Sequence, residues 1–284
     1  MQYLNIPRSQ QKLFLQEVKQ RVGLTWEDLA SLLDVSKSMV YFYANGRHRI
    51  PLCKYTLLCE KSRYTLDSLS IIDISNKPKD ITLPEMCSEL AEFIGIIMGD
   101  GHVSSKNYEV TITLDKYKDH DYVPHVAKLF TDLFTIQPVI HLTKNVARCR
   151  TYSKQLVNFL VNKCEIPAGN RMNRTQIPQS VRSDTKYITS FLRGLFDTDG
   201  SFHRHRVNSA AVEYISRDKR FLQEVGNILR ELQFSVCVSG KSAYIYRKTH
   251  IHAFFNLILP ANPKHQHKYR HFSTHGSVPK TVLL

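Results

Sequence analysis

The feature that most constrains the fold is a pattern that occurs twice, as LAEFIGIIMGDGHV at residues 90–103 and as SFLRGLFDTDGSF at residues 190–202. In each copy, small residues recur at every fourth position before an Asp-Gly pair; they are Ala91, Gly95, Gly99, Ser190, Gly194 and Thr198. Residues four apart share one face of an α-helix, so each copy carries a flat strip that another helix can approach closely. The pattern therefore predicts two helices that pack on each other through these strips.

Both predicted helices end with an aspartate. Apolar residues fill their remaining faces, so each helix is expected to be buried almost all round. The glycine after each aspartate is expected to end the helix, with a turn to follow. Two packed helices with matching ends would bring Asp100 and Asp199 together, where the carboxylates repel each other and meet the unfavourable ends of two helix dipoles. Because a divalent cation would offset that cost, the pattern predicts a metal site.

The motifs GIIMGDG (95–101) and GLFDTDG (194–200) resemble the two signature motifs of single-chain LAGLIDADG homing endonucleases. The resemblance implies an α+β fold, a pseudo-symmetric duplicated αββαββα domain whose sheets form a saddle over DNA. It also implies that Asp100 and Asp199 hold the metal ions, with Gly99 and Thr198 beside them in the metal site. The family places a basic residue late in each half near the metals, which makes Arg174 and Lys268 candidates for catalysis.

The net charge of the chain is +14 and its isoelectric point is near 9.5. A basic balance of this size favours a polyanionic partner, although a protein that is merely soluble and basic remains an alternative. The six cysteines are scattered without a C-x-x-C pair, no apolar run has membrane-spanning length, and the first twenty residues lack a signal-peptide pattern. We therefore expect an intracellular protein, in the cytoplasm or nucleoid, that does not enter membranes.

The N-terminal part reads as a small all-α domain over residues 1–72. Helices are expected at 8–22, 26–33, 37–44, 52–61 and 66–69. Thr25, with Asp28 three residues later, and Ser36 are expected to cap the second and third helices. The segment LTWEDLASLLDVSKSMVYFYANGRHRIP resembles a helix-turn-helix of the phage-repressor type.

The resemblance to a helix-turn-helix assigns DNA contacts to this domain. The N-terminal residues of the second helix of the motif face the major groove, which makes Lys37, Ser38 and Tyr41 the candidates for base contacts. Arg47 and Arg49 follow as candidates for phosphate contacts. A small helical domain that binds a protein partner is the alternative.

A linker is expected at 73–83, where prolines and turn formers replace apolar residues. The two-repeat domain then covers 84–284, with repeat one at about 84–183 and repeat two at about 184–284. Each repeat continues with an alternating run typical of a strand, an amphipathic helix, two more strands and a closing helix. In repeat one these are 109–114, 122–133, 138–143, 147–152 and 154–163. In repeat two they are 211–216, 221–232, 235–239, 243–247 and 251–259.

The strands are also the expected place for DNA contacts, because an antiparallel sheet can pack one face on helices and turn the other to a groove. The candidates are Lys144, Arg148, Arg150, His203, Arg204, His205, Arg206, Lys241, Arg247 and Lys248. By default a surface Lys or Arg is only a solvated charge.

These features together predict a monomeric, site-specific endonuclease that hydrolyses both strands of double-stranded DNA across the minor groove. Asp100 and Asp199 would hold Mg²⁺, or another divalent cation such as Mn²⁺. Two alternatives share the fold: a DNA-binding transcriptional regulator that does not cleave, and an intron RNA maturase.

Overall fold

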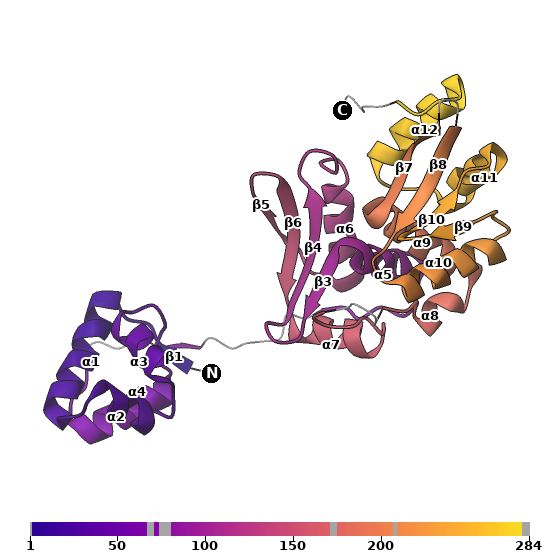
Figure 1. Ribbon diagram of the computed structural model, residues 1–284. Helices are drawn as coiled ribbons and strands as arrows, with labels where there is room; N and C mark the ends of the chain where they lie inside the picture. The colour runs from indigo at the N-terminus through magenta and orange to yellow at the C-terminus, as the bar shows by residue number, and fades with distance from the viewer. Residues whose placement is uncertain (1, 67–70, 74–80, 171–174, 207–208, 280–284) are drawn as a thin grey trace. The chain divides into compact units, whose positions relative to one another are not determined.

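The computed structural model describes residues 2–66, 71–73, 81–170, 175–206 and 209–279. The chain forms two compact units, residues 1–77 and 78–284 (Figure 1). The division between them falls inside the segment that the sequence indicates as a linker.

The first unit consists of four helices and a two-stranded antiparallel sheet within the described residues. Its elements are β1 (Gln2–Leu4), α1 (Arg8–Val22), α2 (Trp26–Leu32), α3 (Lys37–Ala44), α4 (Leu52–Ser62) and β2 (Ile71–Asp73). The sheet, in which Tyr3 lies opposite Ile72, is not predicted from the sequence. Part of the helix expected at 66–69 lies outside the described residues.

The turn between α2 and α3 is fixed by capping. The Thr25 side chain accepts from the Asp28 backbone N–H while the Asp28 carboxylate accepts from the Thr25 N–H, a complete capping box, and Ser36 caps α3. Leu29 and Val40 are fully buried between the helices. The predicted limits of α1 and α3 are confirmed, because the stop and cap residues that define them act locally.

The second unit has two halves with the same order of elements. The first half contains α5 (Ser88–Asp100), β3 (Gly101–Ser104), β4 (Glu109–Asp115), α6 (Val123–Phe134), β5 (Val139–Leu142), β6 (Val146–Tyr152) and α7 (Lys154–Asn162). After α8 (Gln179–Arg182), the second contains α9 (Thr185–Asp199), β7 (Gly200–Arg206), β8 (Ser209–Ile215), α10 (Lys219–Glu231), β9 (Cys237–Ser239), β10 (Ser242–Ile245), α11 (Lys248–Ile258) and α12 (Pro263–His275).

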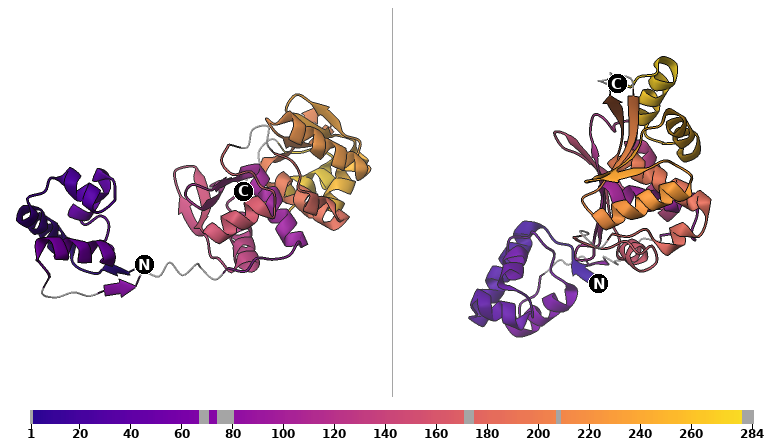
Figure 2. Two further views of the ribbon diagram at one scale, coloured as in Figure 1. Left: turned by 90° about the horizontal axis from the view of Figure 1, so that it is seen from below. Right: turned by 45° about the vertical axis from the view of Figure 1, so that its right-hand side comes forward.

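Each half has one four-stranded antiparallel sheet, in the orders β3-β4-β6-β5 and β7-β8-β10-β9. Helices α6 and α7 contact the first sheet, and α10, α11 and α12 contact the second. Between the sheets α5 packs along α9, and the two halves lie side by side in both views of Figure 2. The α+β fold class and the duplicated order of elements are therefore confirmed.

A strand follows each Asp-Gly pair directly, and in the first half the expected turn comes after that strand, at residues 105–108. Gly101 and Gly200 have extended backbones, with φ of −89° and −93°, and they begin strands β3 and β7 directly. They do not adopt the left-handed cap; instead, a side chain on Gly101 would collide with the backbone of Ile97 in the last turn of α5. Glycine is required here by close approach rather than by a positive φ.

Two helices, α8 and α12, were not predicted from the sequence. Asn262 caps α12 with its side chain and Pro263 occupies its first turn, a start signal that is visible in the sequence. The strand expected at 243–247 is also too long, because the backbone turns into α11 at Lys248.

Candidate active site

The strips of small residues on α5 and α9 are in direct backbone contact. A Cβ atom on Gly95 would lie 2.9 Å from the Leu195 nitrogen and closer still to the carbonyl oxygen of Phe191. A Cβ atom on Gly194 would meet Glu92 and Ile96 in the same way. Real Cβ contacts essentially never fall below 3.0 Å, so only glycine fits at these two positions.

This packing brings the C-terminal ends of the two helices together. A Cβ atom on Gly99 would overlap the Thr198 hydroxyl and lie 3.4 Å from the Asp199 nitrogen. Asp100 and Asp199 are the last residues of α5 and α9, and both are partly exposed. The Thr198 hydroxyl donates to the carbonyl oxygens of Gly194 and Leu195, so its side chain is held by its own helix.

A cavity of about 440 Å³ opens at these helix ends. Asp199 and Gly99 line it together with four residues whose side chains carry oxygen, Asn170, Thr175, Ser216 and Asp218. The exposed Arg217 adds a positive charge to the lining. Sequence reasoning missed Arg217. It follows β8 by two residues, and a basic residue just after the second strand behind an Asp-Gly helix is the signal that would have found it.

The donor set suits a hard divalent cation. Carboxylate, hydroxyl, amide and backbone oxygens are the ligands of Mg²⁺, which usually keeps several waters and needs only one or two protein carboxylates. Within the described part of the chain, no group of three or more His, Cys, Asp or Glu side chains is placed so that it could hold a metal ion. An ion at Asp100 and Asp199 would need water and backbone oxygen to complete its shell.

A buried carboxylate ties the two halves together beside the strips. Glu92 of α5 is 3% exposed and accepts from Arg193 of α9 at 3.2 Å. Its other oxygen lies 2.6 Å from Nε2 of His125 on α6. Since Glu92 and Arg193 belong to different halves, this ion pair fixes the angle and register of α5 on α9.

Asn262 forms a second link between the halves. Its amide donates to Asp119 of the first half at 2.8 Å and to the carbonyl oxygen of Asp197 at 3.1 Å. Lys264 also donates to Asp119, at 2.7 Å. Burial raises the pKa of Asp197 to about 7, although the N–H of Ala261 donates to its carboxylate and opposes the shift. The last turn of α9 is thus held from both sides two residues before Asp199.

The two basic candidates for catalysis have different outcomes. Lys268 lies on α12 and is partly buried; burial, with nearby Lys264 and Lys118, lowers the pKa of its amine. Lys118 follows β4 in the first half, so Lys268 lies where the second half meets the end of a first-half strand. Arg174 lies outside the described residues.

The first sheet presents a polar face on the side away from its helices. Thr111 pairs with Arg150 and Thr113 with Arg148, and these side chains alternate with Ala147 and Cys149, which are buried against the helices. Arg150 lies 3.4 Å from Glu109, so part of its charge is neutralised. Lys144 is exposed in the turn between β5 and β6.

The run 203–206 of the second sheet does not present all its side chains on one face. The His205 ring lies near those of Tyr244 and Tyr246, and His203 lies 3.6 Å from Glu213, all on the polar face. Arg204 alternates with His203 and His205 along the strand, so it lies on the same face of the sheet as the buried Phe202. An irregularity in the strand pairing separates Arg204 from Arg206. The Arg206 side chain lies outside what the structure describes.

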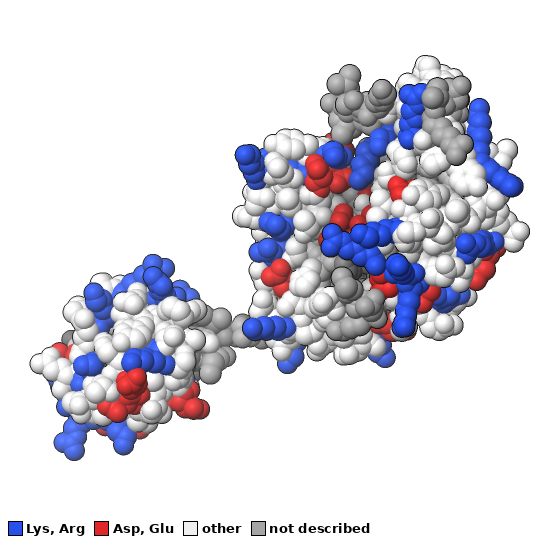
Figure 3. Space-filling model, viewed as in Figure 1, with Lys and Arg blue, Asp and Glu red and all other residues white. Residues whose placement is uncertain are grey.

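The remaining candidates of this sheet lie at its margins. Lys241 is exposed in the turn between β9 and β10, while Arg247 and Lys248 cap and begin α11. On the face seen in Figure 3, Lys and Arg side chains lie across the middle of the second unit, where the two halves meet.

In the first unit, α3 carries the three candidates for base contacts. Tyr41 is 40% exposed and packs on Trp26, while Lys37 pairs with Glu27 at 2.6 Å. Ser38 is exposed beside them. Arg47 and Arg49 are exposed in the segment after α3.

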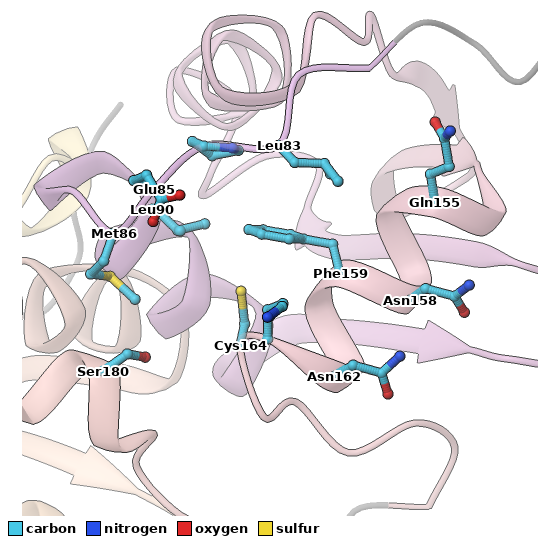
Figure 4. Close-up of a pocket in the computed structure, with 12 residues that line it drawn as sticks. Leu83, Glu85, Met86, Leu90, Gln155, Asn158, Phe159, Asn162, Cys164 and Ser180 are labelled. Carbon is cyan, nitrogen blue, oxygen red and sulfur yellow. The ribbon is translucent and has the colours of Figure 1, made fainter.

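A larger cavity, of about 600 Å³, lies away from the helix ends (Figure 4). Leu83, Leu90 and Phe159 give it apolar walls, and Gln155 and Asn158 of α7 lie at its rim. It shares no lining residue with the cavity at Asp199. None of the helices in the described ranges has the length and apolar character needed to cross a membrane.

Residues 186–258 match the family model of the LAGLIDADG-like domain, which confirms the resemblance seen in the repeated motif. Among curated proteins, the chain is similar to the replication factor C small subunit of Methanocaldococcus jannaschii, with 29% identity over 161 residues. That match covers 56% of this chain and 8% of the relative, so the chain spans less than a tenth of that protein's length.

Two solved structures are similar at low identity. I-DmoI in complex with DNA and Ca has a TM-score of 0.45 and 16% identity, covering 65% of this chain and 97% of that chain. Full-length DUF199/WhiA from Thermatoga maritima has a TM-score of 0.45 and 17% identity, covering 70% of this chain and 65% of that chain.

Proposed function

We propose that this LAGLIDADG-fold chain is a site-specific endonuclease that cuts both strands of double-stranded DNA with divalent metal ions held at Asp100 and Asp199. One observation carries the proposal: two aspartates end two helices that are in backbone contact, which brings two carboxylates to adjoining helix ends. The basic charge of the chain supports a polyanionic substrate.

Mg²⁺ is the proposed cofactor, with Mn²⁺ as a substitute. Asp100 and Asp199 would hold it, and the carbonyl groups of Gly99 and Thr198 lie beside them at the helix ends. When bound, such an ion would lower the pKa of an attacking water and stabilise the leaving 3′ oxygen.

The other residues of the site would act on the phosphodiester itself. Arg217 would hold the scissile phosphate on the Asp199 side, since it lines the same cavity. Lys268 is proposed for the opposite half-site, because it is partly buried close to Lys118 at the end of a strand of the first half. Arg174 remains a proposal from the family pattern.

DNA binding would use the polar faces of the two sheets. Arg148, Arg150, His203 and His205 lie on these faces, while Lys144 and Lys241 lie at the turns. The first unit would add a helix-turn-helix contact through Lys37, Ser38 and Tyr41 on α3. Its capped α2–turn–α3 arrangement supports this proposal.

Cleavage of a randomised duplex library in Mg²⁺, followed by assay of the selected site, tests the proposal. Asp100→Asn and Asp199→Asn keep the size of each side chain and remove its charge, so each should slow double-strand cleavage by at least about 100-fold, the cost of losing one strongly stabilising group. Glu89→Asn is the control, since Glu89 is exposed in the first turn of α5. Cutting at the parental rate by either aspartate variant would refute the assignment.

A DNA-binding protein that does not cleave is the second candidate. It is favoured because, among the described residues, no group of three or more His, Cys, Asp or Glu side chains is arranged to hold a metal ion. Sequence-specific binding in the library without any Mg²⁺- or Mn²⁺-dependent cutting would support it. Preferential binding of an intron transcript over duplex DNA would instead indicate a maturase.

A further inference from the structure

A cavity of about 700 Å³ in the first unit has a mixed lining, in which basic side chains stand beside apolar residues such as Ile6, Met39 and Pro51. Four basic side chains surround it, from α1, from the segment after α3 and from α4; they are Arg8, Arg47, Arg49 and Lys54. None of its lining residues is an Asp or Glu. No ion pair joins the three arginines to a carboxylate within the described residues.

The acceptors nearest this cavity are already used. Gln11 is 3% exposed, and its amide nitrogen donates to the carbonyl oxygens of Tyr43 at 2.7 Å and His48 at 2.8 Å. These two bonds hold the segment after α3 against α1. The cavity therefore keeps a fixed shape, and Arg8, Arg47 and Arg49 supply cationic donors around it, whereas the Lys54 amine already donates to the carbonyl oxygen of Leu33.

The position of Arg8 is also fixed by packing. Gly46 has a φ of +64°, and a side chain there would collide with Cβ and Cγ of Arg8. The stem of Arg8 thus lies against the Gly46 backbone, and the exposed Arg8 lines the same cavity as Arg47 and Arg49. No side chain caps the N-terminus of α1, and its first turn has no acidic residue.

We propose that this cavity binds a phosphate group. Like charges around one cavity repel each other, and a bound anion converts that repulsion into attraction. Guanidinium groups match the geometry of phosphate oxygens in pairs, which favours phosphate over a simple halide. The proposal extends the DNA-binding role proposed for the first unit, because Arg8 and Lys54 have no part in the helix-turn-helix assignment.

The cavity is distinct from the base-contacting surface. Met39 and Tyr43 of α3 line it, and these residues, four apart, share one face of the helix. Lys37 and Tyr41 share a different face. The phosphate site therefore lies beside the surface that would enter a groove, where either a DNA backbone phosphate or a free phosphate ligand could reach it.

The experiment compares full-length Arg8→Gln/Arg49→Gln with Lys12→Gln/Lys61→Gln. Both double variants lose two charges, but Lys12 and Lys61 are exposed on α1 and α4 away from the cavity. Glutamine keeps the Cβ and Cγ of Arg8 that pack on Gly46. Trp26 is the single tryptophan and lies in the first unit, so its fluorescence reports the folding of that unit.

The first arm measures binding to a random-sequence duplex as a function of salt. If the ligand is a backbone phosphate, the slope of log K against log salt should fall by about 1 in the cavity variant and stay unchanged in the control. The second arm measures thermal unfolding by Trp26 fluorescence in inorganic phosphate and in chloride at equal ionic strength. If the ligand is a free phosphate, phosphate should raise the midpoint less in the cavity variant than in the parent and control.

A difference between the cavity variant and the control in either arm supports the site, and the arm in which it occurs tells whether the bound group is a DNA backbone phosphate or free phosphate. Equal behaviour of the two double variants in both arms would overturn it. Neither arm depends on cleavage, so failure of the phosphate site and failure of the proposed nuclease are distinguishable.

Discussion

Replacing Gly194 with alanine should destabilise the second unit strongly, although the same change on an exposed helix stabilises by about 1 kcal/mol. The new Cβ atom would lie 2.9 Å from the Ile96 nitrogen and closer to the Glu92 carbonyl oxygen. Ordinary contact begins at 3.4 Å, so the two helix backbones must separate by more than 3.4 − 2.9 = 0.5 Å. A gap of roughly 0.5 to 1 Å forfeits a quarter to a half of the dispersion attraction across it.

The cost should therefore lie at or above the upper end of the usual range for overpacking, about 3 kcal/mol or more. Urea unfolding followed by far-UV circular dichroism measures it, because tryptophan fluorescence would report only the first unit. Ser190→Ala is the matched control; it changes the same strip without adding an atom and should shift stability by less than about 1 kcal/mol. A midpoint for Gly194→Ala equal to or above that of the parent would refute the reasoning.

Two further changes test the buried polar groups of the second unit. Glu92→Gln should lower the free energy of unfolding by about 2 to 3 kcal/mol, somewhat less than breaking a fully buried ion pair would, because Arg193 keeps some solvent contact. In the same urea assay the control, Glu89→Gln, should lower it by less than about 1 kcal/mol. Burial holds the pKa of His265 well below its usual value, so the unfolded chain binds a proton that the folded chain excludes; the contribution of His265 to stability should be full above pH 6.5 and fall by about 1.4 kcal/mol per pH unit below it, opposite in sign to the contribution of Asp197. His265→Phe should remove that part of the acid sensitivity and His120→Asn should not; an unchanged pH profile for His265→Phe contradicts the assignment.

The strips and the caps could be read from the sequence because each depends on short-range geometry. Small residues four apart predict a close helix contact whatever the rest of the chain does, and Gly95 and Gly194 confirm it. The capping box at Thr25 and Asp28 likewise needs only one helical turn. The roles of Asp100 and Asp199 stay a prediction, since their position at adjoining helix ends is compatible with cleavage without demonstrating it.

The cross-repeat network could not be read from the sequence. Asn262 joins Asp119 and the backbone of Asp197 through contacts that span most of the second unit. No local pattern marks a buried amide as a link rather than a cap, and Asn262 is both. Arg217 is a different case: its place just after the second strand behind an Asp-Gly helix is visible in the sequence, but its nearness to Asp199 arises only once β8 and α9 are packed.

The glycine contact between α5 and α9 restricts how the two halves could have diverged. Each glycine faces main-chain atoms of the opposite helix. Every residue has these atoms, so no substitution on the opposite helix can make room for a larger residue in place of the glycine. A change on one side has no compensating change on the other, whereas the polar sheet faces are built from side chains alone. Sequence divergence is therefore directed to the sheets, where the pair Thr111 and Arg150 of one half already contrasts with the equivalent pair Glu213 and Tyr244 of the other. A duplicated chain of this kind can keep its glycine contact between α5 and α9 unchanged while the sheets of its two halves come to recognise different, non-palindromic sequences.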